Sequence, residues 1–181
     1  MMWRCRYRLD VSCFLLKEIL VDRPAIDVTD HSEFDAFVVV RTDYDRPQAW
    51  AAIQQELVPA DAAEGHMPIP LLVDDPVWAG AGLQAVIEAL AIPAGEEGPS
   101  VVLLADSIAM TSDTHQLLAV DIRRLLDPHE DEEPEDDELE EDEDWEEVPY
   151  FGRISAARAA SMAVNIALAN MDFFELIEAE A

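Results

Sequence analysis

Lysine is almost missing from this chain of 181 residues, in which Lys17 is the only one. Eleven basic residues face forty acidic ones, and the formal net charge at pH 7 is -29. Proteins that bind nucleic acid or anionic membrane need basic surface to neutralise phosphates and release their counterions. The shortage of bases therefore argues against both partners, and a basic protein is the macromolecular partner that this charge favours.

Cysteine is also scarce, because Cys5 and Cys13 are the only two. Two cysteines cannot form a disulfide framework, and their spacing matches no zinc pattern. We interpret them as reduced thiols and expect a cytoplasmic protein. No apolar run is long enough to span a membrane, and acidic and basic residues interrupt the N-terminal apolar stretch, which argues against a signal peptide.

The familiar catalytic motifs are missing as well. The sequence has no glycine-rich dinucleotide fingerprint, no phosphate-binding loop, no Gly-x-Ser-x-Gly and no His-Glu-x-x-His. The histidines are scattered, and His115 is the one expected near the ends of the predicted strands. We keep His115 as a catalytic candidate, although an exposed loop residue is the simpler interpretation. The sequence therefore favours a non-catalytic protein over an enzyme.

What the sequence does contain is three apolar runs separated by helical patterns. Phe37–Asp43 opens with four apolar residues, three of them β-branched, and predicts a strand buried on both faces, as in the centre of a parallel sheet. Ile69–Val73 and Ser100–Ala105 predict two further strands. Helical spacing over residues 46–58, and in a stripe that starts at Leu83 and ends at Leu90, predicts crossover helices between them. The alternation predicts an α/β fold with three mostly parallel strands.

The second half of the chain predicts an antiparallel extension of this sheet. The segment after Asp106 is too short for a crossover helix, so Leu117–Ile122 is expected to run antiparallel to its neighbour. Val148–Ile154 predicts a short fifth strand, and the chain closes in a pair of helices, capped by Ser155 and by Asp172 with Glu175. The predicted architecture is a three-layer-like mixed sheet with a C-terminal helix pair.

Two segments stand apart from the single domain that we assign to residues 24–181. Residues 1–23 are an N-terminal extension rich in bases, which we interpret as a start-site artefact or as an added element. Residues 127–147 hold sixteen acids and no base, and their mutual repulsion and low apolar content predict a disordered acidic insertion. A solvating loop is the simplest interpretation of this insertion, and mimicry of nucleic acid is the alternative.

Carboxylates at the strand ends define a candidate site. In open α/β sheets, ligands bind outside the carboxyl ends of parallel strands, so Asp43, Asp74 and Asp106 are expected to converge there. Clustered carboxylates suit Mg²⁺, which would support phosphoryl transfer or hydrolysis. Aspartates after strands are also ordinary helix caps and turn formers, and we favour this structural interpretation for each, most of all for Asp45 and Asp75.

Two arginines flank the first of these aspartates. Arg41 and Arg46 could clamp an anion beside Asp43, although salt bridges with local acids are the simpler explanation. Asp45 with Gln48 also has the spacing of a capping box for the helix over residues 46–58.

Six short motifs give the chain a resemblance to a known family. They are Val-Thr-Asp at 28–30, Val-Arg-Thr-Asp at 40–43, Val-Asp-Asp-Pro at 73–76, Leu-Leu-Ala-Asp at 103–106, Ala-Val-Asp at 119–121 and Leu-Ala-Asn-Met-Asp-Phe at 168–173. With them the chain resembles a bacterial family of small α/β proteins classed as a domain of unknown function, from Ile26 to Glu178. The resemblance implies no catalytic role. The matching residues are Arg41, Asp43, Asp74, Asp75, Asp106, Asp121, Asn165, Asn170 and Asp172.

The chain departs from that family in two places. The acidic insertion is longer than the connection that the resemblance implies. Alanines also dominate residues 156–160, where the resemblance implies a stretch with proline and tryptophan. If that tryptophan helps to form a site, this chain has lost it.

Three functional hypotheses follow. The first is a non-catalytic cytoplasmic binding or accessory module of an immunity or regulatory kind, with a basic protein as its partner. The second is a Mg²⁺-dependent phosphoryl-transfer or hydrolytic enzyme that uses Asp43, Asp74 and Asp106. The third is a nucleic-acid mimic that acts through residues 127–147.

Overall fold

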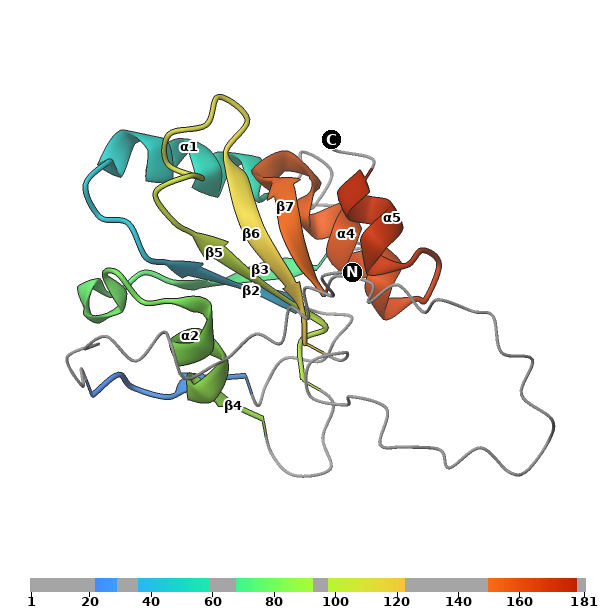
Figure 1. The fold of residues 1–181 in the computed structure, drawn as a ribbon, viewed down its shortest axis with the longest axis horizontal. Coiled ribbons are helices and arrows are strands. Elements are labelled where there is room, and N and C mark those ends of the chain that lie inside the picture. The colour runs from blue at the N-terminus through green and yellow to red at the C-terminus, as the bar shows by residue number, and fades with distance from the viewer. Residues whose placement is uncertain (1–21, 29–35, 59–67, 93–97, 123–149, 179–181) are drawn as a thin grey trace, which may run out of the picture.

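The computed structural model describes residues 22–28, 36–58, 68–92, 98–122 and 150–178. A five-stranded mixed sheet forms the middle layer of this part of the chain (Figure 1). The strand order is β3-β2-β5-β6-β7. Strands β3, β2 and β5 pair in parallel, and β6 pairs antiparallel with both of its neighbours, β5 and β7. The strands are β2 (Ala36–Arg41), β3 (Ile69–Val73), β5 (Val101–Ala105), β6 (Gln116–Asp121) and β7 (Phe151–Ser155).

The predicted central strand is confirmed, because β2 pairs with β3 on one side and with β5 on the other. Its apolar residues alternate between the two faces of the sheet. Phe37 and Val39 belong to one buried cluster, whereas Val38 and Val40 belong to the other. All four are nearly or fully buried, which explains why this strand is apolar at every position instead of at every second one.

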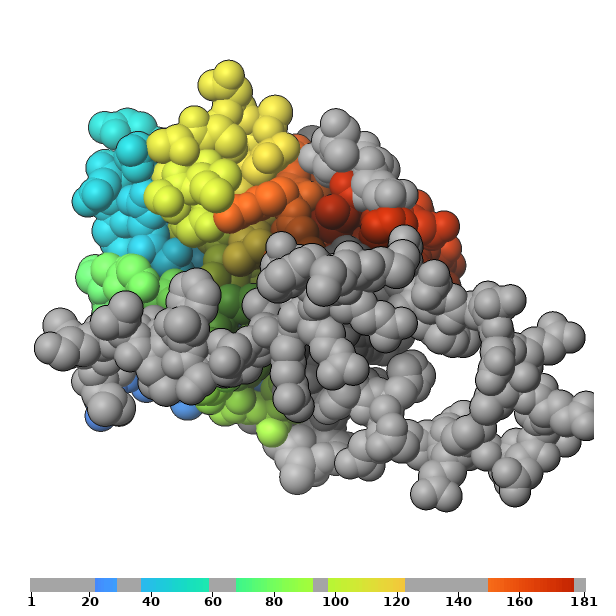
Figure 2. Space-filling model, in the orientation of Figure 1, coloured from blue at the N-terminus to red at the C-terminus, as the bar shows by residue number. Residues whose placement is uncertain are grey.

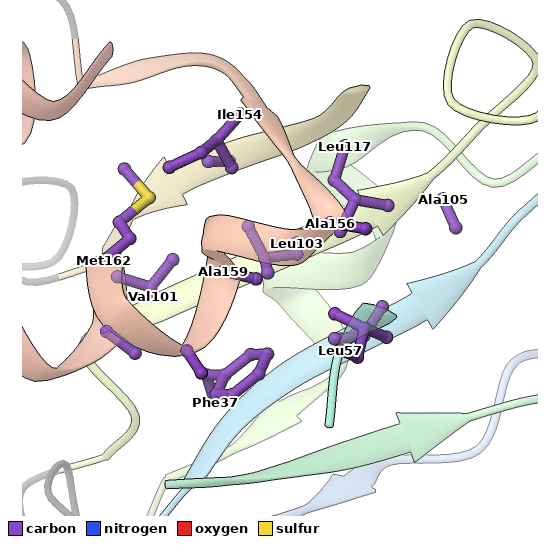
Figure 3. Packing of buried hydrophobic residues seen from close by; sticks show 14 of the residues in the cluster. Phe37, Leu57, Val101, Leu103, Ala105, Leu117, Ile154, Ala156, Ala159 and Met162 are labelled. Atoms are coloured by element: carbon purple, nitrogen blue, oxygen red, sulfur yellow. The ribbon is translucent and has the colours of Figure 1, made fainter. Parts of the chain in front are cut away.

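Three helices cover the first face. They are α1 (Pro47–Glu56), α4 (Ala159–Ala167) and α5 (Phe173–Glu178). Figure 3 shows how buried side chains of α4 meet the sheet, with Met162 near Ile154 and Val101. Ala156 and Ala159 are fully buried in the same cluster, and their small side chains let this segment approach the strands closely.

The second face is covered by α2 (Leu83–Ala89) and by a small parallel sheet of β1 (Ile26–Asp27) and β4 (Leu90–Ala91). This small sheet corrects one expectation, because Leu90 belongs to β4 and not to the helix before it. It also adds Ile26–Asp27 as a strand that the sequence did not predict. Strands of two residues are too short to show a period in the sequence.

The C-terminal segment follows the predicted order with shifted boundaries. A short 3₁₀-helix, η4 (Ala156–Arg158), precedes α4, and the side chain of Ser155 makes no capping bond to it. The capping pair predicted for α5 is confirmed, because Asp172 N donates to Glu175 Oε2 at 3.1 Å. The acidic insertion at 127–147, and residues 1–21 of the extension, lie outside the described residues. No helix in the described part of the chain is long and apolar enough to cross a membrane.

Candidate functional site

The strand order reverses direction between β2 and β5. From β2 the chain goes through α1 to β3 on one side, and it returns through α2 to β5 on the other side. These two helices cover opposite faces of the sheet (Figure 1), so the connections diverge above the carboxyl ends of β2 and β5. Open α/β sheets bind their ligands at such a crevice.

A cavity of about 410 Å³ opens at this position, and we call it the strand-end pocket. Its lining comes from the segments that follow β2 and β5 and from the loop between β3 and α2. The residues are Thr42, Asp43, Tyr44, Asp45, Ala79, Gly80, Ala81, Asp106 and Ser107.

Backbone hydrogen bonds hold the three lining segments together. Thr42 N donates to Ala105 O at 3.0 Å, which joins the end of β2 to the end of β5. Gly80 N donates to Thr42 O at 2.8 Å, and Gly80 has φ of 68°, a left-handed conformation that favours glycine. Thr42 is only 7% exposed, and its hydroxyl has no hydrogen-bond partner among the described residues.

Asp43 organises the turn between β2 and α1. Its Oδ1 accepts a bond from Asp45 N at 2.8 Å, and its Oδ2 lies 3.0 Å from Arg46 Nη1. The predicted capping box of Asp45 and Gln48 is wrong, because Arg46 is the N-cap and no side chain caps α1. The turn at Asp43 bonds the backbone of Asp45 instead, which leaves the exposed Asp45 carboxylate without a partner in the described chain.

Asp106 is held from two directions at the end of β5. Its Oδ1 accepts bonds from the backbone N–H groups of Ile108 and Ala109, both at 3.1 Å. Arg153 of β7 donates to both carboxylate oxygens, at 2.8 and 2.6 Å. Burial raises the pKa of Asp106, but the Arg153 guanidinium and the two backbone donors outweigh it, so the pKa lies below its usual value.

Asp74 takes part in a separate network beside the pocket. Its oxygens accept bonds from Arg41 Nη1 at 3.1 Å and from Trp50 Nε1 at 2.8 Å. The Arg41 guanidinium lies 4.2 Å from the centre of the Tyr44 ring, and its Nε donates to the Asp43 carbonyl at 3.0 Å. The buried Arg41 side chain thus links the ends of β2 and β3. Asp74 does not line the strand-end pocket.

The phenol ring of Tyr44 packs against the Arg41 guanidinium in this network. Burial, and next the negative charge of Asp74, raise the pKa of Tyr44 to about 12. Its hydroxyl oxygen is buried and makes no well-formed hydrogen bond with any described residue, although its proximity to Asp74 adds slightly to the raised pKa.

The structure brings Asp43 and Asp106 to one pocket and places Asp74 elsewhere. Among the described residues, no group of three metal-ligating side chains gathers anywhere. The magnesium site predicted on these three aspartates stays a prediction. Asp75 is a cap, as expected, because its Oδ1 accepts from Val77 N at 3.0 Å at the start of η3 (Pro76–Trp78).

His115 does not line the strand-end pocket. Its Nδ1 lies 3.0 Å from Glu56 Oε1, which joins the connection between β5 and β6 to the end of α1. Figure 2 shows these two segments side by side, in yellow and cyan. The remaining residues of the family motifs also lie outside the pocket lining; they are Asp121, Asn165, Asn170 and Asp172.

The comparison with protein families found a match over residues 36–181 to DUF6924, a domain of unknown function. The chain belongs to this family. The resemblance drawn from the short motifs, to a family of unknown function, is thereby confirmed. A comparison of this DUF6924 protein with curated proteins found no match.

Sequence reasoning missed Thr42 and Arg153 as residues of this site. Thr42 stands within a quoted motif, but a threonine at a strand end carries no signal of its own. Arg153 is the only base in the predicted fifth strand, and this isolated arginine was the one signal that could have predicted an ion pair there. The sequence did not show which acid it would meet.

Proposed function

We propose that this DUF6924 protein is a non-catalytic binding module that receives a cationic group of a basic protein in its strand-end pocket. The observation that carries the proposal is the position and charge of the pocket. It lies where the strand order reverses, and three of its lining residues are aspartates. Two of these carboxylates already serve structural ion pairs, and Asp45 is left for a partner.

The charge of the whole chain supports the same partner. At a net charge of -29 the protein attracts cations from a distance and focuses them into acidic clefts. A module of the immunity or regulatory kind would use this attraction to bind its target quickly. The enzymatic hypothesis has no comparable observation in its favour among the described residues, and residues 127–147, on which the mimicry hypothesis depends, lie outside them.

The test is a titration of the ¹⁵N-labelled protein with a synthetic peptide rich in lysine and arginine, followed by NMR. We expect the amide signals of Thr42, Asp45 and Gly80 to move, and an acidic peptide of the same length to leave them unchanged. Salt should weaken the binding, because screening reduces the attraction between charges.

A matched pair of variants separates the pocket from bulk charge. Asp45→Asn and Asp113→Asn each remove one exposed carboxylate, but only Asp45 lines the pocket. We expect Asp45→Asn to weaken peptide binding several-fold more than Asp113→Asn. Equal losses from the two variants would mean that the peptide responds to net charge alone, and the proposal would then be wrong.

A further inference from the structure

The strand-end pocket is rich in hydrogen-bond acceptors and poor in donors. Most backbone donors of its lining are already used within the protein. They are the N–H groups of Thr42, Asp43, Asp45, Ala79, Gly80 and Ala81. Such a lining does not suit phosphate or another anion, and it matches a ligand that brings its own donors.

The acceptors that remain free lie at the end of β2. Asp106 already accepts two bonds from Arg153 and two from backbone N–H groups, which uses most of its lone pairs. Asp43 accepts one bond on each oxygen and keeps capacity on both. Asp45 keeps all of its capacity, since its carboxylate has no partner in the described chain.

The Thr42 hydroxyl is an independent sign of a ligand. Thr42 is only 7% exposed, but its hydroxyl oxygen is not one of the fully buried polar atoms and stays accessible. Both backbone groups of Thr42 are bonded, to Ala105 and Gly80, whereas its hydroxyl bonds no residue that the structure describes. Because Thr42 lines the pocket, a bound molecule can donate a hydrogen bond to this accessible hydroxyl.

We propose that the strand-end pocket binds a primary alkylammonium group, with the Thr42 hydroxyl and the carboxylates of Asp43 and Asp45 as its acceptors. The inference rests on the proposed function and narrows it to the ammonium of a lysine side chain. A free diamine offers the same chemistry as a lysine side chain.

The arrangement favours ammonium over guanidinium. An ammonium is a compact charge with three donors, and it can bind three separate acceptors. A guanidinium binds best to both oxygens of one carboxylate at once. That mode is already taken at Asp106 by Arg153, and at Asp43 each oxygen holds an internal donor. A guanidinium can therefore use it only at Asp45, whereas an ammonium can bind Asp45, Asp43 and the Thr42 hydroxyl together.

The experiment titrates the full-length ¹⁵N-labelled protein with butylammonium chloride and follows the amides of Thr42 and Gly80. We expect Thr42→Val to weaken binding roughly tenfold, because it removes a hydrogen bond to a charged group. Thr42→Ser keeps the hydroxyl and should keep the affinity, which shows that any loss is not caused by misfolding. Thr114→Val changes an exposed threonine outside the pocket and is the matched control.

Two further probes identify the source of the ammonium. Tighter binding of Nα-acetyl-lysine amide than of 1,5-diaminopentane supports a protein lysine, and the reverse order supports a free diamine. Methylguanidinium binding as tightly as butylammonium would overturn the inference, as would wild-type affinity in Thr42→Val. The proposed function would survive either result, provided that Asp45→Asn still weakens binding of the basic peptide more than Asp113→Asn.

Discussion

Asp106 and Arg153 stand 47 positions apart in the chain, yet their side chains form a two-point ion pair, with Oδ2 2.6 Å from Nη2. Asp106 follows β5 and Arg153 lies on β7, with β6 between them. Arg153 Nη1 also donates to the carbonyl of Gln116, the first residue of β6, at 3.0 Å. One guanidinium therefore joins three strands at the edge of the strand-end pocket.

The Arg153→Met variant should lower the free energy of unfolding by about 1–3 kcal/mol, because the half-buried Asp106 carboxylate loses its charged donors. Arg46→Met is the matched control, since Arg46 pairs with Asp43 from a side chain that is 46% exposed. We expect it to cost less than about 1 kcal/mol. Urea unfolding followed by tryptophan fluorescence measures both, and equal losses would contradict the difference.

Acid should weaken the protein partly through Asp106. Its pKa is lower in the folded chain than in the unfolded one, so its contribution is complete above the unfolded value of about 3.9. That contribution is lost as the pH falls through the lower folded value. Asp106→Asn should therefore show a shallower decline of the urea midpoint below about pH 4. The exposed Asp113→Asn variant should decline like the wild type; if all three decline alike, Asp106 has no such role.

Tyr44 should account for part of the loss of folding stability at high pH. Its pKa is about 12 in the folded protein against 10.0 for an ordinary tyrosine, so the unfolded chain loses this proton first. Stability should therefore fall as the pH rises from 10.0 towards 12, and Tyr44→Phe should reduce that fall. At neutral pH this variant should cost under about 1 kcal/mol, because the Tyr44 hydroxyl makes no well-formed hydrogen bond within the described part of the chain and its contact with Asp74 is the smallest cause of the raised pKa. Tyr150→Phe removes the hydroxyl of a more exposed tyrosine and is the matched control, and an alkaline fall that Tyr44→Phe does not reduce would contradict the prediction.

Gly152 on β7 leaves no room for a side chain. A Cβ at this position would lie 2.6 Å from Ile177 Cγ2 and 2.9 Å from Ile177 Cδ1 of α5. Gly152→Ala should therefore destabilise the protein by about 1–3 kcal/mol. In the Gly152→Ala, Ile177→Ala double variant we expect less destabilisation than the sum of the two single changes. If the losses in free energy of unfolding from the two single changes simply add, α5 moves aside freely and the expected clash is absent.

The sheet could be predicted because its signals are local and strong. An apolar run such as Phe37–Val40 must be buried on both faces of the sheet. Helical spacing on either side of Ile69–Val73 predicts crossover helices that connect parallel strands. The antiparallel turn into β6 followed from the short connection after Asp106. The strand-end location of the pocket then followed from topology, and Asp43 and Asp106 were both expected there.

The partners of these aspartates could not be predicted. Asp74 bonds Trp50, which lies on the helix between β2 and β3, and Asp106 bonds Arg153 from the other end of the sheet. Such pairings depend on three-dimensional distances that one sequence does not encode in any spacing. The capping box predicted at Asp45 is wrong for a local reason. The side chain of Asp43 accepts the bond from the Asp45 N–H, and the side chain of Asp45 does not cap α1.

The bond between Asp106 and Arg153 also has a consequence for timing. A nascent polypeptide leaves the ribosome from its N-terminus, so Asp106 emerges well before the strand that carries its arginine. Until β7 joins the sheet, this carboxylate stays unneutralised and the crevice wall is unfinished. This chain should therefore complete the wall of the strand-end pocket only late in its own synthesis.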